Sequence, residues 1–467
     1  MKAITRRQLL KTGLYSTALL SLPQSAWAAA RPPLLIPPLL ESRRGRPLYL
    51  TLETVRKALI EDKSTEVWGF NGLYLGPTIR VKRGEFVRLV YRNNLSRPVA
   101  MNLQGLQAPA ELLGGVGKVL LPNQSWSPII SIEQAPATCW YQGYSLTQTA
   151  YETYRGLAGM WIIEEPNSPK NALPNQYGVN DIPLILQDLE LNNQGTQLFQ
   201  PNQNQFLGNR LFVNGQQSPY LKVARGWVRL RIVNASLSRR YELSCDDGRD
   251  LHWIASDQGF LPVSRAVKSL SLAPSERAEI LLDLNEGGNV RLMAGRATNL
   301  WDKLTGLFSA EQNLLDNTIL ELRPEGLLSV FSQQPRIPFP PDLTLPTTIS
   351  QERHFHINND NAMINQRRFD PRRIDVNAKL GSLERWNISA DSPVGFRLQG
   401  ARFIIESIDN QPLPPEQQGW KDTVWVDKSV QLLVHFINPS SHNFPLTFGT
   451  SDLMLADKGA MGLMVVQ

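Results

Sequence analysis

Apolar and polar residues alternate in short runs along most of this chain. A typical stretch has apolar residues at every second position, as in Ile79 and Val81 and again in Phe86 and Val90, on either side of Gly84. A period of two residues predicts β-strands that bury one face, and a glycine between two strands supplies the positive φ of a tight turn. No long amphipathic helical pattern appears, so the chain is expected to consist mainly of strands and turns.

The same strand–turn–strand unit occurs three times. Each copy has an asparagine that opens a turn and a glycine that follows some residues later: Asn71 with Gly84, Asn214 with Gly226, and Asn365 with Gly381. The third copy is weaker, because Gln366 stands where the other two have glycine directly after the asparagine. The copies begin 143 and 151 residues apart, which is the length of a domain and not of a solenoid repeat.

The strand pattern and the repeat period together predict an all-β chain of three antiparallel sandwich or Greek-key barrel domains. We place the boundaries at the Asn- and Pro-rich segment after Glu164 and at the Pro-rich segment 323–348. The predicted units are a leader at 1–28 and domains at 29–166, 167–325 and 326–467. One short helix is expected at 150–155.

Length and composition agree with three globular domains. The chain has 467 residues, of which 42% are apolar and 19% charged, an ordinary balance for folded proteins. Its net charge of +6 comes largely from residues 1–28, since removing their four basic side chains leaves 44 basic against 42 acidic residues, or +2. A mature chain so nearly balanced, with no long basic run, argues against nucleic-acid binding.

The two cysteines, Cys139 and Cys245, are too few for a disulfide framework. A single bridge is possible in an oxidising compartment, but two buried thiols are the preferred expectation. In either case disulfide bonds would not be what holds so long a chain together.

The first 28 residues have the features of an export signal. Arg6 and Arg7 precede the apolar stretch 14–22, which is too short to span a bilayer stably. Ala26 and Ala28 then provide the small residues of a cleavage site, so we predict a cleaved twin-arginine signal. An uncleaved membrane anchor is the weaker alternative, because Pro23 directly follows the apolar run. Twin-arginine export moves folded proteins, often with a cofactor, and this makes a metal enzyme plausible.

Several segments resemble the three-domain multicopper oxidase family, whose domains have the cupredoxin fold. The most specific are Gly76–Gly84, Tyr154–Gly159, Val213–Gly215, Leu272–Arg277 and Asp422–Val424, and the match covers nearly the whole chain after the leader. Within the family, the chain looks closest to a twin-arginine-exported, copper-free cell-division protein, through Pro38–Gly45, Ser218–Tyr220, Arg225–Arg231, Asp257–Pro262 and Gly419–Asp427. The resemblance implies three cupredoxin-like domains and a periplasmic protein at the division septum.

The resemblance also implies where copper ligands would stand. Such oxidases use one copper bound by cysteine, histidine and methionine and a three-copper cluster bound by His-x-His pairs. Residues i and i+2 of a strand share one face, which suits such a pair. The ligand positions fall here on Asn102, Gln104, Gln142, Tyr144, Val394, Arg397, Gln399, Gly449, Thr450, Ser451, Leu455 and Ala460.

None of these ligand positions holds a histidine or a cysteine. The whole chain has five histidines, too few for four His-x-His pairs: His252, His354, His356, His435 and His442. Amide and methyl groups do not replace imidazole and thiolate as copper ligands. We therefore expect no copper, no other cofactor and no catalytic residue.

Two further groups of possible metal ligands have simpler interpretations. His354 and His356 form the one surviving His-x-His pair, and a surface pair on the first strand of domain three is preferred over half a metal site. Met454, Met461 and Met464 could bind copper(I), but core packing fits their place near the last strand better.

Two short motifs carry weak functional hypotheses. Asp246-Asp247-Gly248, with Asp250 and His252 nearby, could form an acid–base cluster, but a hairpin turn is the preferred interpretation. The segment Gly114–Lys118 resembles a phosphate-binding loop only superficially, because its spacing is wrong and Val119 replaces the required Ser or Thr.

The sequence thus predicts a non-catalytic periplasmic protein that stabilises or protects the division machinery, particularly under stress, by binding other proteins. Expected partners are proteins of the divisome and the twin-arginine translocase. No nucleic acid, small-molecule substrate or stable membrane insertion is expected, and the chain is expected to be a monomer. The alternative is a periplasmic multicopper-type oxidase with a non-standard metal site. No part of the sequence marks the binding surface.

Overall fold

The computed structural model describes residues 31–60, 62–169, 172–295, 314–414 and 418–467. In these ranges the chain forms six β-sheets and three short helices, α2 (Ala110–Leu113), α3 (Thr149–Arg155) and α5 (Leu453–Lys458), which confirms the all-β prediction. None of the helices in the described ranges has the length and apolarity needed to cross a membrane. The predicted signal residues Arg6, Arg7, Ala26 and Ala28 lie outside the described residues.

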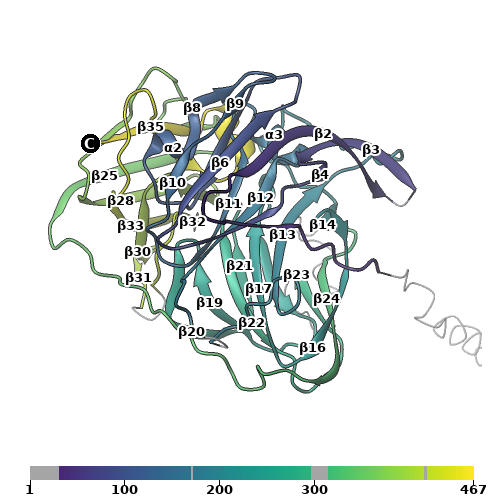
Figure 1. Ribbon diagram of the computed structural model, residues 1–467. Helices are drawn as coiled ribbons and strands as arrows, with labels where there is room; N and C mark the ends of the chain where they lie inside the picture. Colours follow the sequence, from purple (N-terminus) through teal and green to yellow (C-terminus); the bar gives the residue numbers. More distant parts are fainter. Residues whose placement is uncertain (1–30, 61, 170–171, 296–313, 415–417) are drawn as a thin grey trace, which may run out of the picture.

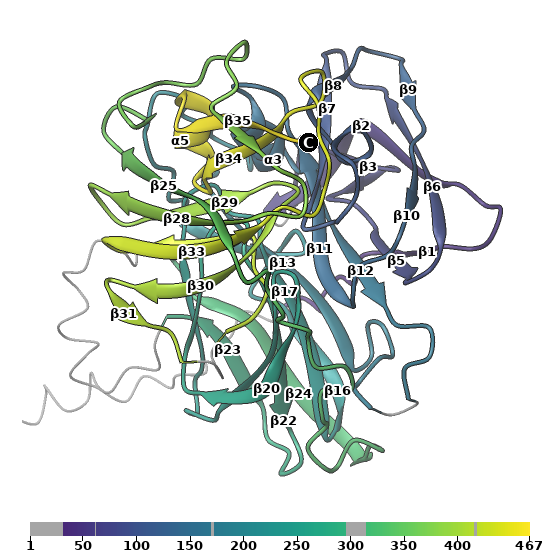
Figure 2. The ribbon, with the colours of Figure 1, turned by 90° about the vertical axis from the view of Figure 1, so that its left-hand side faces the viewer.

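The six sheets form three pairs in chain order, which we call sandwiches 1, 2 and 3. In Figures 1 and 2, sandwiches 1 and 3 stand side by side and sandwich 2 lies below them. The first sheet of sandwich 1 contains, in spatial order, β1 (Leu39–Glu41), β5 (Thr78–Lys82), β12 (Ala158–Glu164), β11 (Ala137–Gly143), β7 (Val99–Gln104) and β8 (Gly114–Leu120). The second sheet contains β10 (Ile129–Ser131), β6 (Phe86–Asn93), β2 (Leu48–Ile60), β3 (Lys63–Phe70) and β4 (Leu73–Tyr74), and β9 (Ser125–Trp126) also pairs with β6.

Sandwiches 2 and 3 repeat this layout. The first sheet of sandwich 2 contains β15 (Gln216–Gln217), β14 (Arg210–Val213), β13 (Asp181–Leu189), β17 (Trp227–Asn234), β22 (Arg277–Asp283), β19 (Leu251–Ser256) and β20 (Gly259–Val267). Its second sheet contains β16 (Tyr220–Arg225), β24 (Thr318–Leu328), β23 (Val290–Ala294), β18 (Tyr241–Cys245) and β21 (Leu270–Leu272). The first sheet of sandwich 3 contains β26 (Met363–Ile364), β25 (Ile349–Asn358), β28 (Leu383–Ala390), β33 (Ser429–His435), β30 (Arg402–Ile408) and β31 (Gln411–Pro412). Its second sheet contains β27 (Val376–Ala378), β35 (Met461–Val466), β34 (Leu446–Thr450), β29 (Val394–Leu398) and β32 (Thr423–Val426).

The three repeated asparagines open the same turn in each sandwich. Asn71, Asn214 and Asn365 have φ angles of 54°, 51° and 49°, and the residue after each also has a positive φ, as a type I′ turn requires. Each amide side chain also bonds the backbone of the first long strand of its sandwich, as when the Thr51 N–H donates to the Asn71 Oδ1 over 2.8 Å and the His356 N–H donates to the Asn365 Oδ1 over 2.7 Å. The repeat is confirmed, and this second role explains why asparagine recurs where the following glycine does not.

The expectation of antiparallel pairing throughout is wrong, because every sheet contains a parallel pair. The equivalent pairs are β2 with β6, β13 with β17 and β25 with β28. Between the members of each pair the chain passes through one strand of the opposite sheet, namely β5, β16 or β27. Parallel neighbours need a crossover connection of this kind, because a direct hairpin would make them antiparallel.

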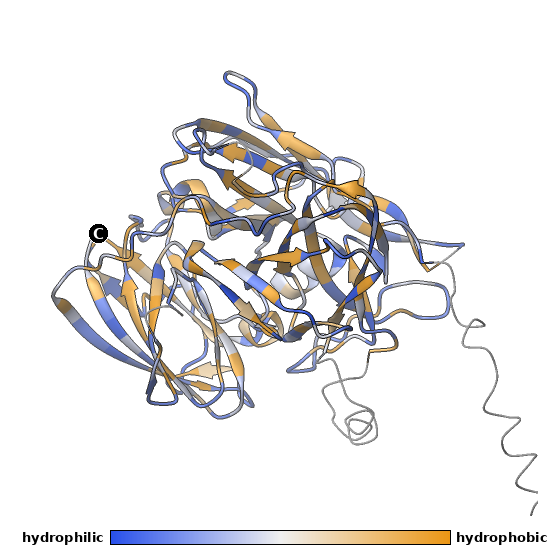
Figure 3. Cartoon of the chain, turned by 90° about the horizontal axis from the view of Figure 1, so that it is seen from below, coloured by the Kyte–Doolittle hydropathy of each residue, from blue (hydrophilic) through white to orange (hydrophobic). Residues whose placement is uncertain are grey.

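The interior of each sandwich is made by every second residue of its strands, and the alternation of blue and orange along the strands is visible in Figure 3. In β6 the buried face consists of Val87, Leu89 and Tyr91, whereas Phe86 is 76% exposed, so the alternation begins one residue later than the sequence pattern indicates. A single apolar cluster contains core residues of both sandwich 1 and sandwich 3, while sandwich 2 has its own. Sandwiches 1 and 3 therefore share a continuous core.

Two connecting segments form strand-like pairings that their composition does not show. Near the start of the described chain, the Leu34 N–H donates to the Tyr220 carbonyl over 2.7 Å, so the proline-rich lead-in lies along β16 of sandwich 2. The segment predicted as a linker at 323–348 begins inside β24, which continues to Leu328 beside β16. The predicted helix at 150–155 is confirmed as α3.

Candidate functional site at the junction of the sandwiches

The positions that the family resemblance assigns to copper ligands meet between sandwiches 1 and 3. Asn102 and Gln104 lie on β7, and Gln399 directly follows β29. The Gln399 Nε2 donates to the Asn102 Oδ1, and the Gln104 Nε2 donates to the Leu398 carbonyl over 3.0 Å. Residues almost 300 positions apart in the chain thus face one another across the junction.

Neutral amides occupy this position in a closed network of hydrogen bonds. The Asn102 Nδ2 donates to the Gln104 Oε1 over 3.4 Å, and the Thr447 hydroxyl donates to the Gln399 Oε1 over 3.1 Å. The side chains of Asn102, Gln104 and Gln399 are at most 3% exposed. Because buried amides need such partners, the network itself accounts for these residue types.

A buried guanidinium lies beside the amides. The Arg397 Nη2 donates to the Tyr144 hydroxyl over 3.2 Å, and its Nη1 donates to the Ser275 hydroxyl of sandwich 2 over 3.3 Å. The Tyr144 ring is 5.1 Å from this guanidinium. A fixed positive charge at a position assigned to a copper ligand disfavours a second cation there, since like charges repel strongly away from water.

The remaining assigned positions are packed rather than open. The Thr153 hydroxyl of α3 donates to the Gln142 Oε1 over 3.3 Å. The others are buried and apolar or hydroxyl-bearing, apart from one glycine: Val394, Gly449, Thr450, Ser451, Leu455 and Ala460. Among the described residues, no three side chains of His, Cys, Asp or Glu gather in a group that could hold a metal ion.

The alternative metal-binding candidates lie elsewhere. His354 and His356 are exposed on β25, where the His356 ring bonds Ser389 and Asp391, so the predicted surface pair is confirmed. Met454 and Met464 are buried core residues, as expected, and Met461 is half-buried. Cys139 and Cys245 are free and buried, as preferred from the sequence, and burial raises the pKa of each thiol to about 12.

The two weak motifs are structural. Asp246 and Asp247 form a turn, but the predicted hairpin is wrong, because β18 and β19 on either side belong to opposite sheets of sandwich 2. The chain crosses between sheets there and does not fold back on one. The glycine-rich segment from Gly114 to Lys118 lies in β8, where Gly114 pairs with Asn102 of β7 and the next four residues bulge out of the register.

A second feature of the junction is a buried group of charges that the sequence analysis did not identify. Both terminal nitrogens of Arg277 donate to the Asp422 carboxylate over 2.6 Å, and the Arg277 backbone N–H donates to the Asp257 Oδ1 over 2.8 Å. The Lys421 Nζ lies 3.0 Å from Asp257 and 2.9 Å from Glu276. Three segments that carry the family resemblance, around residues 257, 277 and 422, therefore meet here, and their convergence was the available signal.

Arg277 and Asp422 hold each other in the ionised state, whereas burial raises the pKa of Glu276 despite the nearby Lys421. Burial opposes the charged Arg277, but Asp422 and Asp257 outweigh it and raise the pKa of the guanidinium. Burial likewise opposes ionisation of Asp422, yet Arg277 keeps the pKa of that carboxyl below its ordinary value. The group ties β22 of sandwich 2 to the start of β32 in sandwich 3.

A similar group joins sandwiches 1 and 2. Arg231 lies 2.8 Å from Asp181 and 2.9 Å from Glu279, and the Thr138 hydroxyl of sandwich 1 donates to Glu279 over 2.7 Å. Burial opposes the charge on Glu279, but Arg229 and Arg231 lower the pKa of its carboxyl to about 2. Polar contacts fully removed from water thus connect sandwich 2 to both of its neighbours.

Three carboxyls at the junction have pKa values moved in the other direction. Asp457 accepts from the N–H groups of Thr149 and Ala150 at the start of α3, over 3.1 and 2.8 Å. Asp452 caps α5 in the same way. Burial raises the pKa of both to about 7 and that of Glu152 in α3 to about 8, because the nearby donors do not compensate for lost water.

Removing one amide tests whether the network of Asn102, Gln104 and Gln399 stabilises the junction. Asn102→Ala leaves the buried Gln399 amide without its acceptor, and we expect the free energy of unfolding to fall by about 1–3 kcal/mol. Urea unfolding measures the change. Asn193→Ala, in an exposed turn, is the matched control and should change stability by less than about 0.5 kcal/mol. Equal stability of both variants would contradict the assignment.

Comparison with known proteins agrees with the predicted resemblance. Residues 53–168 match the multicopper oxidase family. The cell-division protein FtsP of Actinobacillus succinogenes is 57% identical over 463 residues, with 99% of each chain covered, and FtsP of Aggregatibacter aphrophilus is 56% identical over 470 residues, with 100% of each chain covered.

Solved structures show the same fold. A laccase-like multicopper oxidase, CueO from an Ochrobactrum species, superposes with a TM-score of 0.86 at 30% identity, covering 93% of this chain and all of its own. The multicopper oxidase McoA of Aquifex aeolicus gives a TM-score of 0.81 at 23% identity, covering 94% of this chain, and indicates the fold alone. The prediction of cupredoxin-like sandwiches is confirmed.

Proposed function

Because the chain belongs to the family of the cell-division protein FtsP, we propose that it acts in cell division as a non-catalytic binding protein. Its role is to stabilise or protect the divisome, particularly under stress. It works in the periplasm, after export in folded form by the twin-arginine route, and its partners are divisome proteins.

One observation carries the non-catalytic part of the proposal. Where the resemblance places imidazoles for a copper cluster, the junction holds the amides of Asn102, Gln104 and Gln399 and the guanidinium of Arg397, bonded to one another and to the backbone. These groups lack the imidazole and thiolate donors that copper prefers. A fold shared with oxidases therefore serves here as a scaffold.

The junction supports a binding role in a second way. A buried ion pair connects sandwich 2 to sandwich 3, and the Thr138 hydroxyl of sandwich 1 bonds the buried Glu279 of sandwich 2. Sandwiches 1 and 3 share a core. Such networks resist relative motion of the parts, because opening them would leave charges buried without partners. The three sandwiches thus present one outer surface of fixed shape, which favours recognition of a partner without reorganisation.

Cells that lack this chain test the proposal. We expect longer cells or filaments after heat or osmotic stress, and restoration of normal length by the intact chain expressed from a plasmid. A chain with Arg6→Lys and Arg7→Lys should not restore length, because it would stay in the cytoplasm. Unchanged cell length under every stress would contradict the role in division.

A second candidate function, a multicopper-type oxidase, is favoured only by the fold and by 30% identity to a laccase-like enzyme. We expect the purified, copper-supplemented protein to contain far less than one copper per chain and to leave phenols unoxidised. Elemental analysis and an oxidation assay measure both. Stoichiometric copper together with oxidation would support the second candidate and contradict the first.

A further inference from the structure

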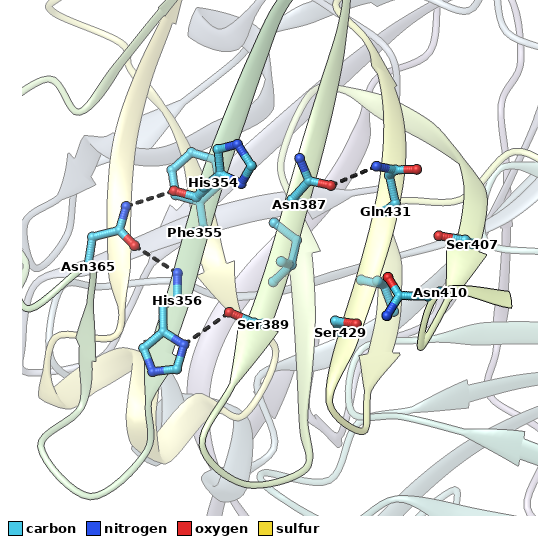
Figure 4. A pocket seen from close by; sticks show the side chains of 12 residues that line it. His354, Phe355, His356, Asn365, Asn387, Ser389, Ser407, Asn410, Ser429 and Gln431 are labelled. Atoms are coloured by element: carbon cyan, nitrogen blue, oxygen red, sulfur yellow. Dashed lines mark hydrogen bonds between the residues drawn. The ribbon is translucent and has the colours of Figure 1, made fainter.

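The outer face of sandwich 3 has a hollow of about 350 Å³ that no function described above uses. Figure 4 shows it on the sheet that contains β25, β28, β33 and β30. Along these strands apolar residues such as Trp386 and Leu432 point into the core, while Asn387 and Gln431 point outward. The solvent-facing residues of these four strands therefore line the hollow.

Strand register arranges its polar groups in two rows across the sheet. In the first row His354 pairs with Asn387, Asn387 with Gln431, and Gln431 with Ser407. In the second row His356 pairs with Ser389, which pairs with Ser429. Four strands at the usual spacing of about 4.8 Å give the first row a length of roughly 14 Å. That length suits an extended ligand that crosses the strands.

Hydrogen bonds within the protein orient the polar side chains of the hollow but leave much of their hydrogen-bonding capacity unused. The Gln431 Nε2 donates to the Asn387 Oδ1 over 2.8 Å, and the Asn387 Nδ2 donates to Glu352 over 2.7 Å. Each of these amides keeps a second N–H and a free acceptor lone pair. Within the described chain, the hydroxyls of Ser407 and Ser429 have no protein partner. The first row therefore presents oriented amide donors and acceptors, and both rows include hydroxyl groups.

The kind of group in the hollow limits the kind of ligand. None of the residues that line it is Lys, Arg, Asp or Glu, so it offers no lysine or arginine for phosphate or carboxylate. Glu352 and Asp391 bond lining residues at its edge, but no group of three metal-binding side chains forms there among the described residues. Its apolar side chains are few and mostly buried, so a hydrophobic peptide would gain little. Hydroxyl groups both donate and accept, and an acetamido group presents the same donor and acceptor as Asn and Gln.

From these features we propose that the outer face of sandwich 3 binds an uncharged saccharide that contains N-acetylated amino sugars, with Asn387 and Gln431 as its central contacts. The inference does not depend on the proposed division role, because the hollow and its chemistry belong to sandwich 3 alone. Binding in solution and the cell-length experiment can therefore fail independently.

Calorimetric titration of the purified chain with chitotetraose, the tetramer of N-acetylglucosamine, tests the proposal. We expect saturable binding, and at least about tenfold weaker binding after Asn387→Ala and Gln431→Ala together, since two hydrogen-bonding side chains are lost. The matched control removes two exposed amides elsewhere, with Asn193→Ala and Gln194→Ala, and should bind like the unaltered chain.

Other outcomes of this titration overturn the proposal. Absence of saturable binding would contradict the proposal. Equal affinity of the Asn387/Gln431 double variant and the unaltered chain would show that this face is not the binding site. Equal affinity for maltotetraose, which lacks acetamido groups, would remove the amino-sugar assignment. If the double variant does not fold, Ser429→Phe fills the hollow without deleting an amide, and unchanged binding by that variant would equally contradict the proposal.

Discussion

Replacing Arg277 with methionine is expected to lower the free energy of unfolding by about 3–5 kcal/mol, because it leaves buried carboxylates without their partner. Arg277 and Asp422 are each about 1% exposed, and two hydrogen bonds of 2.6 Å join them. Asp257 also loses a neighbouring cation. Urea unfolding followed by tryptophan fluorescence measures the loss.

A surface ion pair provides the control for this prediction. Arg385 bonds Glu406 over 2.8 Å with both side chains about 30% exposed, so Arg385→Met should cost no more than about 1 kcal/mol. The double variant Arg277→Met/Asp422→Leu should be at least as stable as Arg277→Met, because it removes the stranded charge along with its partner. Equal losses for Arg277→Met and Arg385→Met would refute the view that buried charges lock the junction.

The second large effect is a loss of stability between about pH 4 and pH 8. Asp452 and Asp457 have folded pKa values of about 7 and Glu152 of about 8, raised by burial above their ordinary values of 3.8 and 4.5. Between the unfolded and folded pKa values the native state binds more protons than the unfolded state, so stability falls as pH rises. Each aspartate contributes up to about 4 kcal/mol to this fall, at about 1.4 kcal/mol per pKa unit.

The free energy of unfolding also falls at lower pH. Glu279, with its pKa lowered to about 2, and Asp422, also lowered, stabilise the fold above their unfolded pKa and lose that contribution as pH falls through their folded values. Together the two sets predict maximal stability at mildly acidic pH. The two sets differ because directly bonded arginines outweigh burial at Glu279 and Asp422, whereas burial dominates at the other three carboxyls.

Asp457→Asn tests the predicted loss of stability as pH rises. The variant keeps one of the two oxygens that accept from the N–H groups of Thr149 and Ala150, and it cannot ionise. Its unfolding free energy should therefore change less between pH 5 and pH 8 than that of the unaltered chain. Asp360→Asn, at an exposed residue, should leave the pH dependence as it is. An unaltered slope in Asp457→Asn would show that this carboxyl does not titrate in the window.

What the sequence predicts well in this chain is local. The turns at Asn71 and Asn214 follow from residues that favour a positive φ, and the helix at α3 follows from its own short segment. Their recurrence at domain-length spacing is enough to predict three related sandwiches. The exposed histidine pair on β25 follows equally from the alternation of its strand.

What the sequence misses depends on partners far along the chain. The parallel pairing of β2 with β6 depends on a crossing through the opposite sheet, and no residue in either strand encodes it. Arg277 and Asp422 are 145 positions apart, and a charged residue in a strand ordinarily indicates a solvated face. The amides at the positions that the resemblance assigns to copper ligands were identified from the sequence, but their bonding across the junction needed the fold.

We propose that this cupredoxin scaffold acts at the division site by binding and not by copper chemistry. Time-lapse imaging of a fluorescent fusion exported by the twin-arginine route tests it most directly, in cells whose own copy is deleted. We expect a band at midcell that appears with constriction, unchanged when copper is removed from the medium. An even distribution round the envelope at every stage, or midcell enrichment that requires copper, would contradict this account.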